Sequence, residues 1–299
     1  MVSIIISSFN DRENLENCLH SIQSSSYPHY EIIVIDAGST DGTIEMLNSS
    51  FPQVKCILKK GAGVGEALNT GIRHAKGEFL LFNLNTDEMI HPNFFRELVN
   101  ILVTQQRIGA ICGKRYFAGT QILQSAGAAF SRWIGISKRP KNVNSHQPFE
   151  IDYAGHYMVK KELVDSGLRH DEKYFVYFED ADFCFQIRKL GYRILCVPTA
   201  ISWHKVSSTT GRNKPRQYYY MRRGYFRFIL KHFNPPFLVT ALVAQFGYSC
   251  LMLLNNLMRK RKDYIWAELS ALKWNFKNCR ATILERQMMN STLSKLRNR

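Results

Sequence analysis

Short apolar runs alternate with helical patterns through the first hundred residues, and this alternation constrains the fold more than any other feature. The apolar runs are rich in β-branched residues and cover residues 2–7, 31–36, 54–58 and 79–83. The segments that follow them place apolar residues at helical spacing, at 12–24, 41–49, 65–75 and 92–105. This order predicts βαβ units on a parallel sheet. Runs such as Ile32-Ile33-Val34-Ile35 lack polar alternation, so we expect helices on both faces of the sheet.

Polar loops follow three of these strands. They are Ser8-Phe9-Asn10, Asp36-Ala37-Gly38-Ser39 and Asn85-Thr86-Asp87. In open α/β sheets, ligands bind at the carboxyl ends of the strands. We therefore expect the three loops to share one edge of the sheet and to carry the functional site.

The alternation weakens beyond residue 110, where Gly and Ser recur to about residue 150. Helical patterns return at 160–166 and 181–190, followed by a strand-like run at Tyr192–Val197. A loop of Ser, Thr and Gly at 207–213 then leads into a basic, aromatic helical pattern at Gln217–Phe233. We expect one α/β domain at residues 1–235 and a helical, basic C-terminal region at 236–299.

The composition is that of a folded globular protein, with 45% hydrophobic and 21% charged residues in a chain of 299. The seven cysteines show no CxxC pair or other short spacing that would bind zinc, so we expect reduced thiols. The first residues run directly into an apolar strand, without the basic region and cleavage site of a secretory signal. These features predict a cytoplasmic location.

Positive charge is concentrated in the second half of the chain. The net charge is +16, and no Asp or Glu lies between Asp182 and Asp263, a stretch with fifteen Lys and Arg residues. Such a segment needs an anionic partner, for which nucleic acids, diphosphates and anionic lipid headgroups all qualify. No zinc, RNP-type or helix-turn-helix motif accompanies the charge, so we expect no nucleic-acid partner.

An uncharged stretch from Pro235 to Met258 ends at the basic cluster Arg259-Lys260-Arg261-Lys262. It is long enough to cross a bilayer. Polar residues at 245, 249 and 256 recur at helical spacing and form a narrow stripe. An interfacial or membrane-facing helix, a buried core helix and a true membrane span all fit this pattern. The basic cluster favours the anionic cytoplasmic surface of a membrane.

Two acids and a histidine follow strand-like runs and could bind ligands. Asp36 could accept hydrogen bonds from a nucleotide base or ribose, although a turn and a helix cap explain it equally well. Asp87 offers a hard oxygen ligand for Mg²⁺ or Mn²⁺, and His204 could complete the protein part of such a metal site. Each of these residues alone is more often structural.

Three carboxylates precede a helical pattern, at Glu179, Asp180 and Asp182. The helix dipole and capping account for one or two of them. The third could act as a general base toward an alcohol, and we assign that role to Asp180. Further along, Arg222 and Arg223 could close over a diphosphate, or could form a solvated basic helix face.

Six strings of residues, taken together, carry a family resemblance. They are Ser7-Ser8-Phe9-Asn10, Val34-Ile35-Asp36-Ala37-Gly38-Ser39-Thr40-Asp41-Gly42, Asn69-Thr70-Gly71-Ile72, Leu84-Asn85-Thr86-Asp87, Phe175-Val176-Tyr177-Phe178-Glu179-Asp180-Ala181-Asp182, and Val197-Pro198 with His204. In this combination the chain resembles family 2 glycosyltransferases with the GT-A fold. It is most similar to the rhamnosyltransferase-like branch, which builds bacterial surface polysaccharides.

The resemblance implies a Rossmann-like mixed sheet and a metal-dependent, inverting transfer of a sugar from a nucleotide-diphosphate donor to an acceptor hydroxyl. It implies nucleotide contacts at Ser8, Asn10, Asp36 and Ser39, with Arg222 in a closing segment. Metal contacts are implied at Asp87 and His204, and base catalysis at Asp180. Secondary candidates are Asn85, Glu179, Asp182 and Arg223. Asn85 stands where the family's DxD motif usually begins with Asp, which leaves one fewer anionic ligand.

The expected cofactor is Mg²⁺ or Mn²⁺, and the first choice of donor sugar is rhamnose. The expected acceptor is a surface glycan or a lipid-linked glycan, handled by an enzyme that is peripheral at the inner face of the membrane. The alternative is a catalytically silent nucleotide-sugar-binding or assembly subunit, for which Asn85 is the only hint.

A dinucleotide-binding oxidoreductase is a further alternative, because Gly61-Ala62-Gly63-Val64-Gly65 lies between a strand and a helix. The motif fails on spacing, since Glu66 stands where the third glycine is required. The loop after the first strand, which should carry that motif, is instead Ser-Phe-Asn-Asp.

Overall fold

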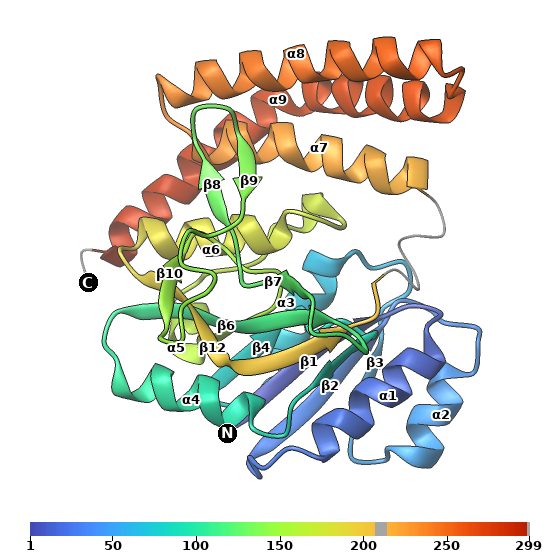
Figure 1. The fold of residues 1–299 in the computed structure, drawn as a ribbon, viewed down its shortest axis with the longest axis vertical. Coiled ribbons are helices and arrows are strands. Elements are labelled where there is room, and N and C mark those ends of the chain that lie inside the picture. Colours follow the sequence, from blue (N-terminus) through green and yellow to red (C-terminus); the bar gives the residue numbers. More distant parts are fainter. Residues whose placement is uncertain (207–213, 298–299) are drawn as a thin grey trace. The chain divides into compact units, whose positions relative to one another are not determined.

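The computed structural model describes residues 1–206 and 214–297, and their contacts divide the chain into two units (Figure 1). Unit 1 comprises Met1–Ala128, Arg139–Phe175 and Glu179–Thr209, and unit 2 comprises Ala129–Lys138, Val176–Phe178 and Thr210–Arg299. The loop expected at 207–213 lies outside the described residues. Each unit is described by itself.

The first four strands of unit 1 form the parallel half of a sheet. They are β1 (Val2–Ser8), β2 (Tyr30–Asp36), β3 (Lys55–Leu58) and β4 (Phe79–Phe82), in the order β4-β1-β2-β3. Their β-branched, uninterrupted sequences favour strands that are buried on both faces. The register pairs Ser8 with Asp36, so the polar loops that follow β1 and β2 start side by side. The predicted α/β architecture is confirmed.

Helices cover both faces of this sheet. On one face, α1 (Arg12–Gln23), α2 (Thr43–Ser50) and α4 (Phe94–Thr104) pack against Val2, Ile4 and Ile6 in one apolar core. The opposite face carries α3 (Val64–His74), which lies close to β1. A Cβ added to Gly71 of α3 would come within 2.3 Å of Ile5 Cγ2, so this close approach requires glycine.

The second half of the sheet is mixed. β11 (Tyr157–Lys160) runs antiparallel between β4 and β6 (Ile108–Phe117), and β6 pairs in parallel with β12 (Arg193–His204). Shorter strands complete it, namely β5 (Glu88–Ile90) and β10 (Phe149–Ile151) on β12, and β7 (Leu123–Ser125) on β6. The segment from 110 to 150, where the sequence indicated only a weakened pattern, therefore contains short strands whose partners are distant in sequence.

Three further elements of unit 1 complete the region around α3. They are α5 (Lys161–Asp165), the 3₁₀ helix η1 (Glu172–Tyr174) and α6 (Glu179–Lys189). The backbone N–H of Val64 donates to Phe175 O at 2.6 Å, and a Cβ on Gly63 would lie 2.7 Å from the same oxygen. Gly63 is thus required by the close passage of the chain after η1. This packing accounts for one glycine of the apparent dinucleotide motif.

Unit 2 is mainly helical. It contains α7 (Lys214–His232), α8 (Phe237–Met258) and α9 (Lys262–Arg297), together with the hairpin of β8 (Ala129–Ser131) and β9 (Ile136–Lys138). Figure 1 shows α8 and α9 running alongside each other. The predicted helical C-terminal region is confirmed, and α7, which precedes the expected boundary at residue 235, groups with the helices that follow it.

Candidate active site

The loops after β1 and β2 form one hydrogen-bonded turn. Asp36 is fully buried and accepts hydrogen bonds from the backbone N–H groups of Gly38 and Ser39 at 2.9 and 2.7 Å, and from Ser39 Oγ at 2.6 Å. Asn10 N donates to Ser39 Oγ at 2.8 Å, and Asn10 Oδ1 accepts from Thr40 N at 2.7 Å. The carboxylate of Asp36 therefore acts here through the shape of the loop, which is the turn role that the sequence left open.

Ser8 lies at the end of β1, opposite Asp36 in the register. Its hydroxyl is buried and has no hydrogen-bond partner among the described residues. Buried hydroxyl groups rarely remain unpaired in native proteins, because desolvation without a partner is costly. The neighbouring Asn10 adopts a φ of 48°, in a region that non-glycine residues seldom occupy and that is enriched at ligand sites. Both features fit a ligand-binding edge.

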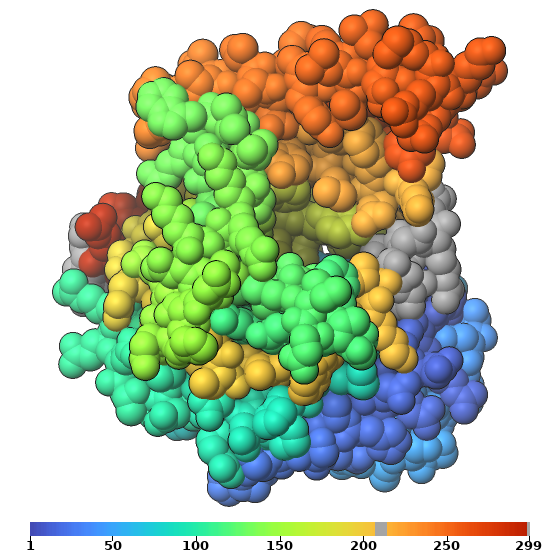
Figure 2. Space-filling model, viewed as in Figure 1, coloured from blue at the N-terminus to red at the C-terminus, as the bar shows by residue number. Residues whose placement is uncertain are grey.

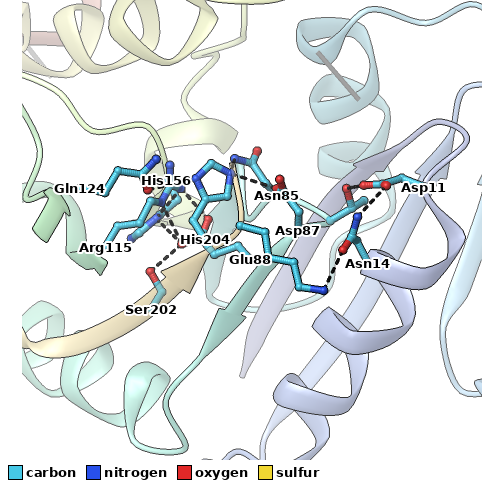
Figure 3. A network of polar contacts seen from close by, with 12 residues as sticks. Asp11, Asn14, Asn85, Asp87, Glu88, Arg115, Gln124, His156, Ser202 and His204 are labelled. Atoms are coloured by element: carbon cyan, nitrogen blue, oxygen red, sulfur yellow. Dashed lines mark hydrogen bonds and ion pairs between the residues drawn. The ribbon is translucent and has the colours of Figure 1, made fainter. Parts of the chain in front are cut away.

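Asp87 and His204 meet because β5 pairs antiparallel with β12, which sets His204 opposite Glu88. His204 Nε2 lies 3.0 Å from Asp87 Oδ1, while His204 Nδ1 lies 3.0 Å from Gln124 Oε1 on β7 (Figure 3). Burial raises the pKa of Asp87, but the hydrogen bond and charge of His204 outweigh it and hold that pKa below its ordinary value. Asp87 is therefore ionised at neutral pH.

The surroundings of His204 suit a divalent cation. A neutral imidazole has one N–H, yet both ring nitrogens face acceptor oxygens. A metal ion would have to displace the proton by which Nε2 bonds Asp87; with Nδ1–H still donated to Gln124, the lone pair of Nε2 and the Asp87 carboxylate would then both be available to it. Asn85 Nδ2 also lies 3.3 Å from His204 Nε2. Within residues 1–206 and 214–297, no group of three or more His, Cys, Asp or Glu could hold a metal.

A buried ion-pair network lies directly behind Asp87. Glu88 is fully buried. Its carboxylate accepts hydrogen bonds from Arg115 Nη2 at 2.6 Å, Ser202 Oγ at 2.6 Å and His156 Nδ1 at 2.9 Å (Figure 3). Burial raises the pKa of Glu88, but the charge of Arg115 and the bonds from His156 and Ser202 outweigh it and lower that pKa strongly. Burial also lowers the pKa of His156, whose Nε2 accepts from Gly113 N. This network fixes β5, which directly follows Asp87.

Asp180 lies at the start of α6, and both Asp180 and Arg115 lie near Gly155. A Cβ on Gly155 would lie 3.9 Å from Asp180 Oδ2 and 3.5 Å from Arg115 Nη1. Asp180 is half-buried, and its Oδ1 accepts from Ala181 N at 2.7 Å. Arg115, which is bonded to Glu88 next to Asp87, therefore also lies close to Asp180.

The two acids beside Asp180 have different surroundings. Burial, together with the charge of Asp180, raises the pKa of Glu179 to about 8. Glu179 Oε2 is buried without a partner among the described residues, while Oε1 accepts weakly from Asn83 Nδ2 at 3.5 Å. Asp182 is fully buried and bonded to Gln186 Nε2 at 2.8 Å, which gives it a packing role.

The carboxyl edge of unit 1 therefore brings together most of the predicted site residues. Asp11 connects the loop after β1 to the loop after β4, since Asp11 Oδ2 accepts a hydrogen bond from Thr86 Oγ1 at 2.5 Å (Figure 3). The residues on this edge are Ser8, Asn10, Asp36, Ser39, Asn85, Asp87, Glu179, Asp180 and His204.

Arg222 and Arg223 belong to unit 2 and have partners there. Arg222 is 4% exposed, and its guanidinium donates to Glu268, to Gln245 and to Ser249. Arg223 lies over the ring of Trp274, with 4.4 Å between Arg223 Cζ and the ring centroid. All three guanidinium nitrogens of Arg222 therefore have partners within unit 2, and its expected diphosphate contact stays a prediction.

Several residues that shape this site were not predicted from the sequence. They are Asp11, Glu88, Arg115, Gln124, His156 and Ser202. Arg115 and Gln124 come from the mixed half of the sheet, where pairing is non-local. Glu88 directly follows Asp87. Of its properties, only its burial could have been predicted from the alternation of side chains along a strand.

The mixed sheet, with acids and a histidine at its carboxyl edge, places the protein in the class of GT-A glycosyltransferase folds. The chain belongs to glycosyl transferase family 2, whose profile matches residues 3–168. Among curated proteins, it is 26% identical over 217 residues to the poly-beta-1,6-N-acetyl-D-glucosamine synthase of Staphylococcus epidermidis, covering 70% of this chain and 51% of that protein. It is 34% identical over 102 residues to an uncharacterized glycosyltransferase of Rickettsia typhi, covering 34% of this chain and 32% of that protein.

Solved structures share the fold at low sequence identity. Residues 1–349 of S. aureus TarS match with a TM-score of 0.58 and 16% identity, over 99% of this chain and 91% of that one. GalNAc-T7 with UDP, GalNAc and Mn²⁺ matches with a TM-score of 0.62 and 18% identity, over 77% of this chain and 48% of that one. The chain spans 32% to 51% of the length of the two curated relatives named above, so their complete activities are not transferred to it.

Proposed function

We propose that the protein transfers a sugar from a nucleotide-diphosphate donor to an acceptor hydroxyl, with inversion at the anomeric carbon. The observation that carries the proposal is the shared edge on which Asp87 with His204 and Asp180 lie, with Arg115 bonded beside Asp87 and close to Asp180. A base on one side of the sugar and a diphosphate-binding pair on the other is the arrangement that a single in-line displacement needs.

In the proposed reaction, Asp180 accepts the proton of the acceptor hydroxyl as its oxygen attacks the anomeric carbon. The bond from that carbon to the diphosphate oxygen breaks at the same time, and the nucleoside diphosphate leaves. Ser8 and Asn10 contact the nucleotide, and the turn built on Asp36 and Ser39 shapes their edge of the site.

Asp87 and His204 would hold the divalent cation, Mg²⁺ or Mn²⁺, together with oxygens of the donor diphosphate. When bound, the cation supplies positive charge that stabilises the leaving diphosphate. The presence of Mn²⁺ and UDP in a structure with the same fold supports this choice. Gln124 would keep His204 in the orientation in which Nε2 faces the cation.

The donor sugar and the acceptor are the finer parts of the proposal. Rhamnose is the first choice from sequence, while a curated relative is named for N-acetyl-D-glucosamine and a TarS structure contains UDP-GlcNAc. Both sugars therefore belong in the first donor panel. We propose a surface or lipid-linked glycan as the acceptor, handled at the cytoplasmic face of a membrane.

The test is a panel of nucleotide sugars, measured for binding and for hydrolysis or transfer, with and without Mg²⁺ or Mn²⁺. Asp180→Asn should retain donor affinity and lose at least about a hundredfold in turnover, because it removes the base and keeps the shape. Asp165→Asn, an exposed acid of unit 1 outside the site, is the matched control and should keep full turnover.

Two results would contradict the proposal. An Asp180→Asn enzyme with normal turnover would refute the choice of base. Donor binding without turnover in the wild-type protein, across the panel and with either metal, would favour the silent nucleotide-sugar-binding subunit.

A further inference from the structure

The helix α8 in unit 2 has the reverse of the usual surface-helix polarity. Its buried side chains are Ala241, Gln245, Ser249 and Asn256. Most of its exposed side chains are large and apolar, and they include Val239, Val243, Phe246, Leu251, Leu254, Leu257 and Met258. A surface helix of a water-soluble protein normally presents its polar stripe to solvent and its apolar stripe to the core.

Buried polar partners explain why the polar stripe of α8 faces inward. Arg222 Nη1 donates to Gln245 Oε1 and Arg222 Nη2 donates to Ser249 Oγ, both at 2.8 Å. The same guanidinium is paired with the fully buried Glu268 of α9 at 3.2 Å. Turning α8 over would leave these charged groups without their partners, which is costly in a buried position. The outward direction of the apolar side chains is therefore fixed by the chain itself.

The exposed face of α8 has the character of a surface that requires an apolar environment. The helix is 22 residues long with a mean hydropathy of 1.9 in its most apolar window, of which 17% is buried. Val243 and Phe246 are 68% and 60% exposed. Both also line a shallow apolar groove of about 390 Å³ with Leu242 and Phe226. A buried core helix, one of the three sequence-based alternatives, is not compatible with this exposure.

The residues around α8 favour an anionic lipid bilayer as the occupant. The cluster Arg259-Lys260-Arg261-Lys262 directly follows the helix, and all four residues are exposed. Each such residue adds attraction to anionic headgroups. On α9, exposed Trp266, Leu269 and Phe276 share one helical stripe with Lys273 and Arg280. Mixed aromatic and basic residues on one stripe are typical of helices that lie at the interface between lipid and water.

The contacts of α8 also argue against a membrane span. Figure 1 shows α9 alongside α8, and the first half of α9 carries the charged residues Asp263, Lys273 and Lys277. A span by α8 would draw these charges toward the hydrocarbon core, where charged side chains are rarely tolerated. Figure 2 shows α8, in orange, along an outer edge of unit 2, as a helix lying in the plane of a membrane surface would be.

We propose that the exposed apolar face of α8, flanked by residues 259–262 and by the aromatic stripe of α9, docks unit 2 onto the surface of an anionic lipid bilayer. Basic side chains contact the headgroups while Val243, Phe246 and Leu254 enter the boundary between headgroups and acyl chains. This surface would hold the enzyme at the cytoplasmic face of a membrane, the location included in the proposed function. Docking itself requires neither donor nor acceptor.

The experiment is flotation of the full-length protein with vesicles of phosphatidylcholine alone or with an equal part of phosphatidylglycerol. Wild-type protein should float with the anionic vesicles and dissociate partly at high salt. Val243→Gln with Phe246→Gln should weaken binding at least about tenfold, because both side chains lose favourable apolar burial. Neutralising Arg259, Lys260 and Lys262 to Gln should weaken it about a hundredfold, at about 1 kcal/mol per residue.

Val103→Gln, at a similarly exposed apolar position of α4, is the matched control and should bind as wild type does. Circular dichroism confirms that each variant is folded, and donor binding measured without vesicles separates loss of docking from loss of the proposed function. The proposal is overturned if wild-type protein does not float with anionic vesicles, or if the α8 variants float equally well. A stable dimer that Val243→Gln with Phe246→Gln dissociates, without vesicle binding, would assign the face to a second copy of the chain.

Discussion

Replacing Arg222 with Met should destabilise unit 2 strongly without weakening donor binding. The substitution keeps a long side chain but removes the guanidinium that pairs with Glu268, which is fully buried. Removing one partner of a buried pair costs about 3–5 kcal/mol, because the other charge stays buried and uncompensated. Gln245 and Ser249 would also lose their donor.

The double variant Arg222→Met with Glu268→Leu separates pairing from packing. Removing both charges leaves no uncompensated ion, so we expect the double variant to recover at least about 2 kcal/mol relative to Arg222→Met. Urea unfolding followed by tryptophan fluorescence suits the measurement, since Trp133, Trp266 and Trp274 all lie in unit 2. Donor affinity, measured by calorimetry on the folded proteins, should match that of the wild type.

The reasoning is refuted by an Arg222→Met protein that unfolds at the wild-type urea concentration and binds the donor more weakly. That combination would return Arg222 to the diphosphate contact expected from sequence. A double variant as unstable as Arg222→Met would show that side-chain packing, and not the uncompensated charge of Glu268, dominates the loss.

Two further predictions follow from buried groups of unit 1. The pKa of Glu179 is raised to about 8 from an ordinary 4.5, so between these pH values the folded protein keeps a proton that the unfolded chain releases. The free energy of unfolding of the wild-type protein should therefore fall as pH rises from 4.5 to about 8. Glu179→Gln should reduce this fall by about 1 kcal/mol or more in urea unfolding, and an unchanged slope would contradict the raised pKa. Gly63→Ala should lower the free energy of unfolding by about 1–3 kcal/mol, because the added Cβ would lie 2.7 Å from Phe175 O. Gly247→Ala on α8, where an added Cβ has nothing within 4 Å, should be neutral or stabilising. Equal stability of the two variants would show that the space at Gly63 does not limit the side chain.

The parallel half of the fold could be predicted because its signals are local. The runs that became β1, β2 and β4 have apolar centres, and α1 and α2 directly follow the first two, with a periodicity that lies within one short window. The mixed half could not be predicted in the same way, because β6, β11 and β12 find partners far away in sequence. Pairing of this kind leaves only a weak trace in any single segment.

The site divides along the same line. Asp87 and His204 were predicted together, as residues that follow strands and then from the family resemblance, whereas Gln124 and Arg115, which hold their surroundings in place, were not. Both unpredicted residues lie on β6 and β7, so only the pairing of these strands brings them to the site. For α8, the spacing of Gln245, Ser249 and Asn256 predicted a polar stripe, but the sequence could not show that the stripe faces inward, because its partners lie on α7 and α9.

The inward polar stripe of α8 has a practical consequence for anyone who prepares this protein. Deleting residues 237–258 to remove an apolar segment would expose Arg222 and Glu268 to water and destabilise the helical unit. Polar replacements at the outward positions, such as Val243 and Leu254, leave that interior intact and offer the better route to a protein that stays dispersed without detergent.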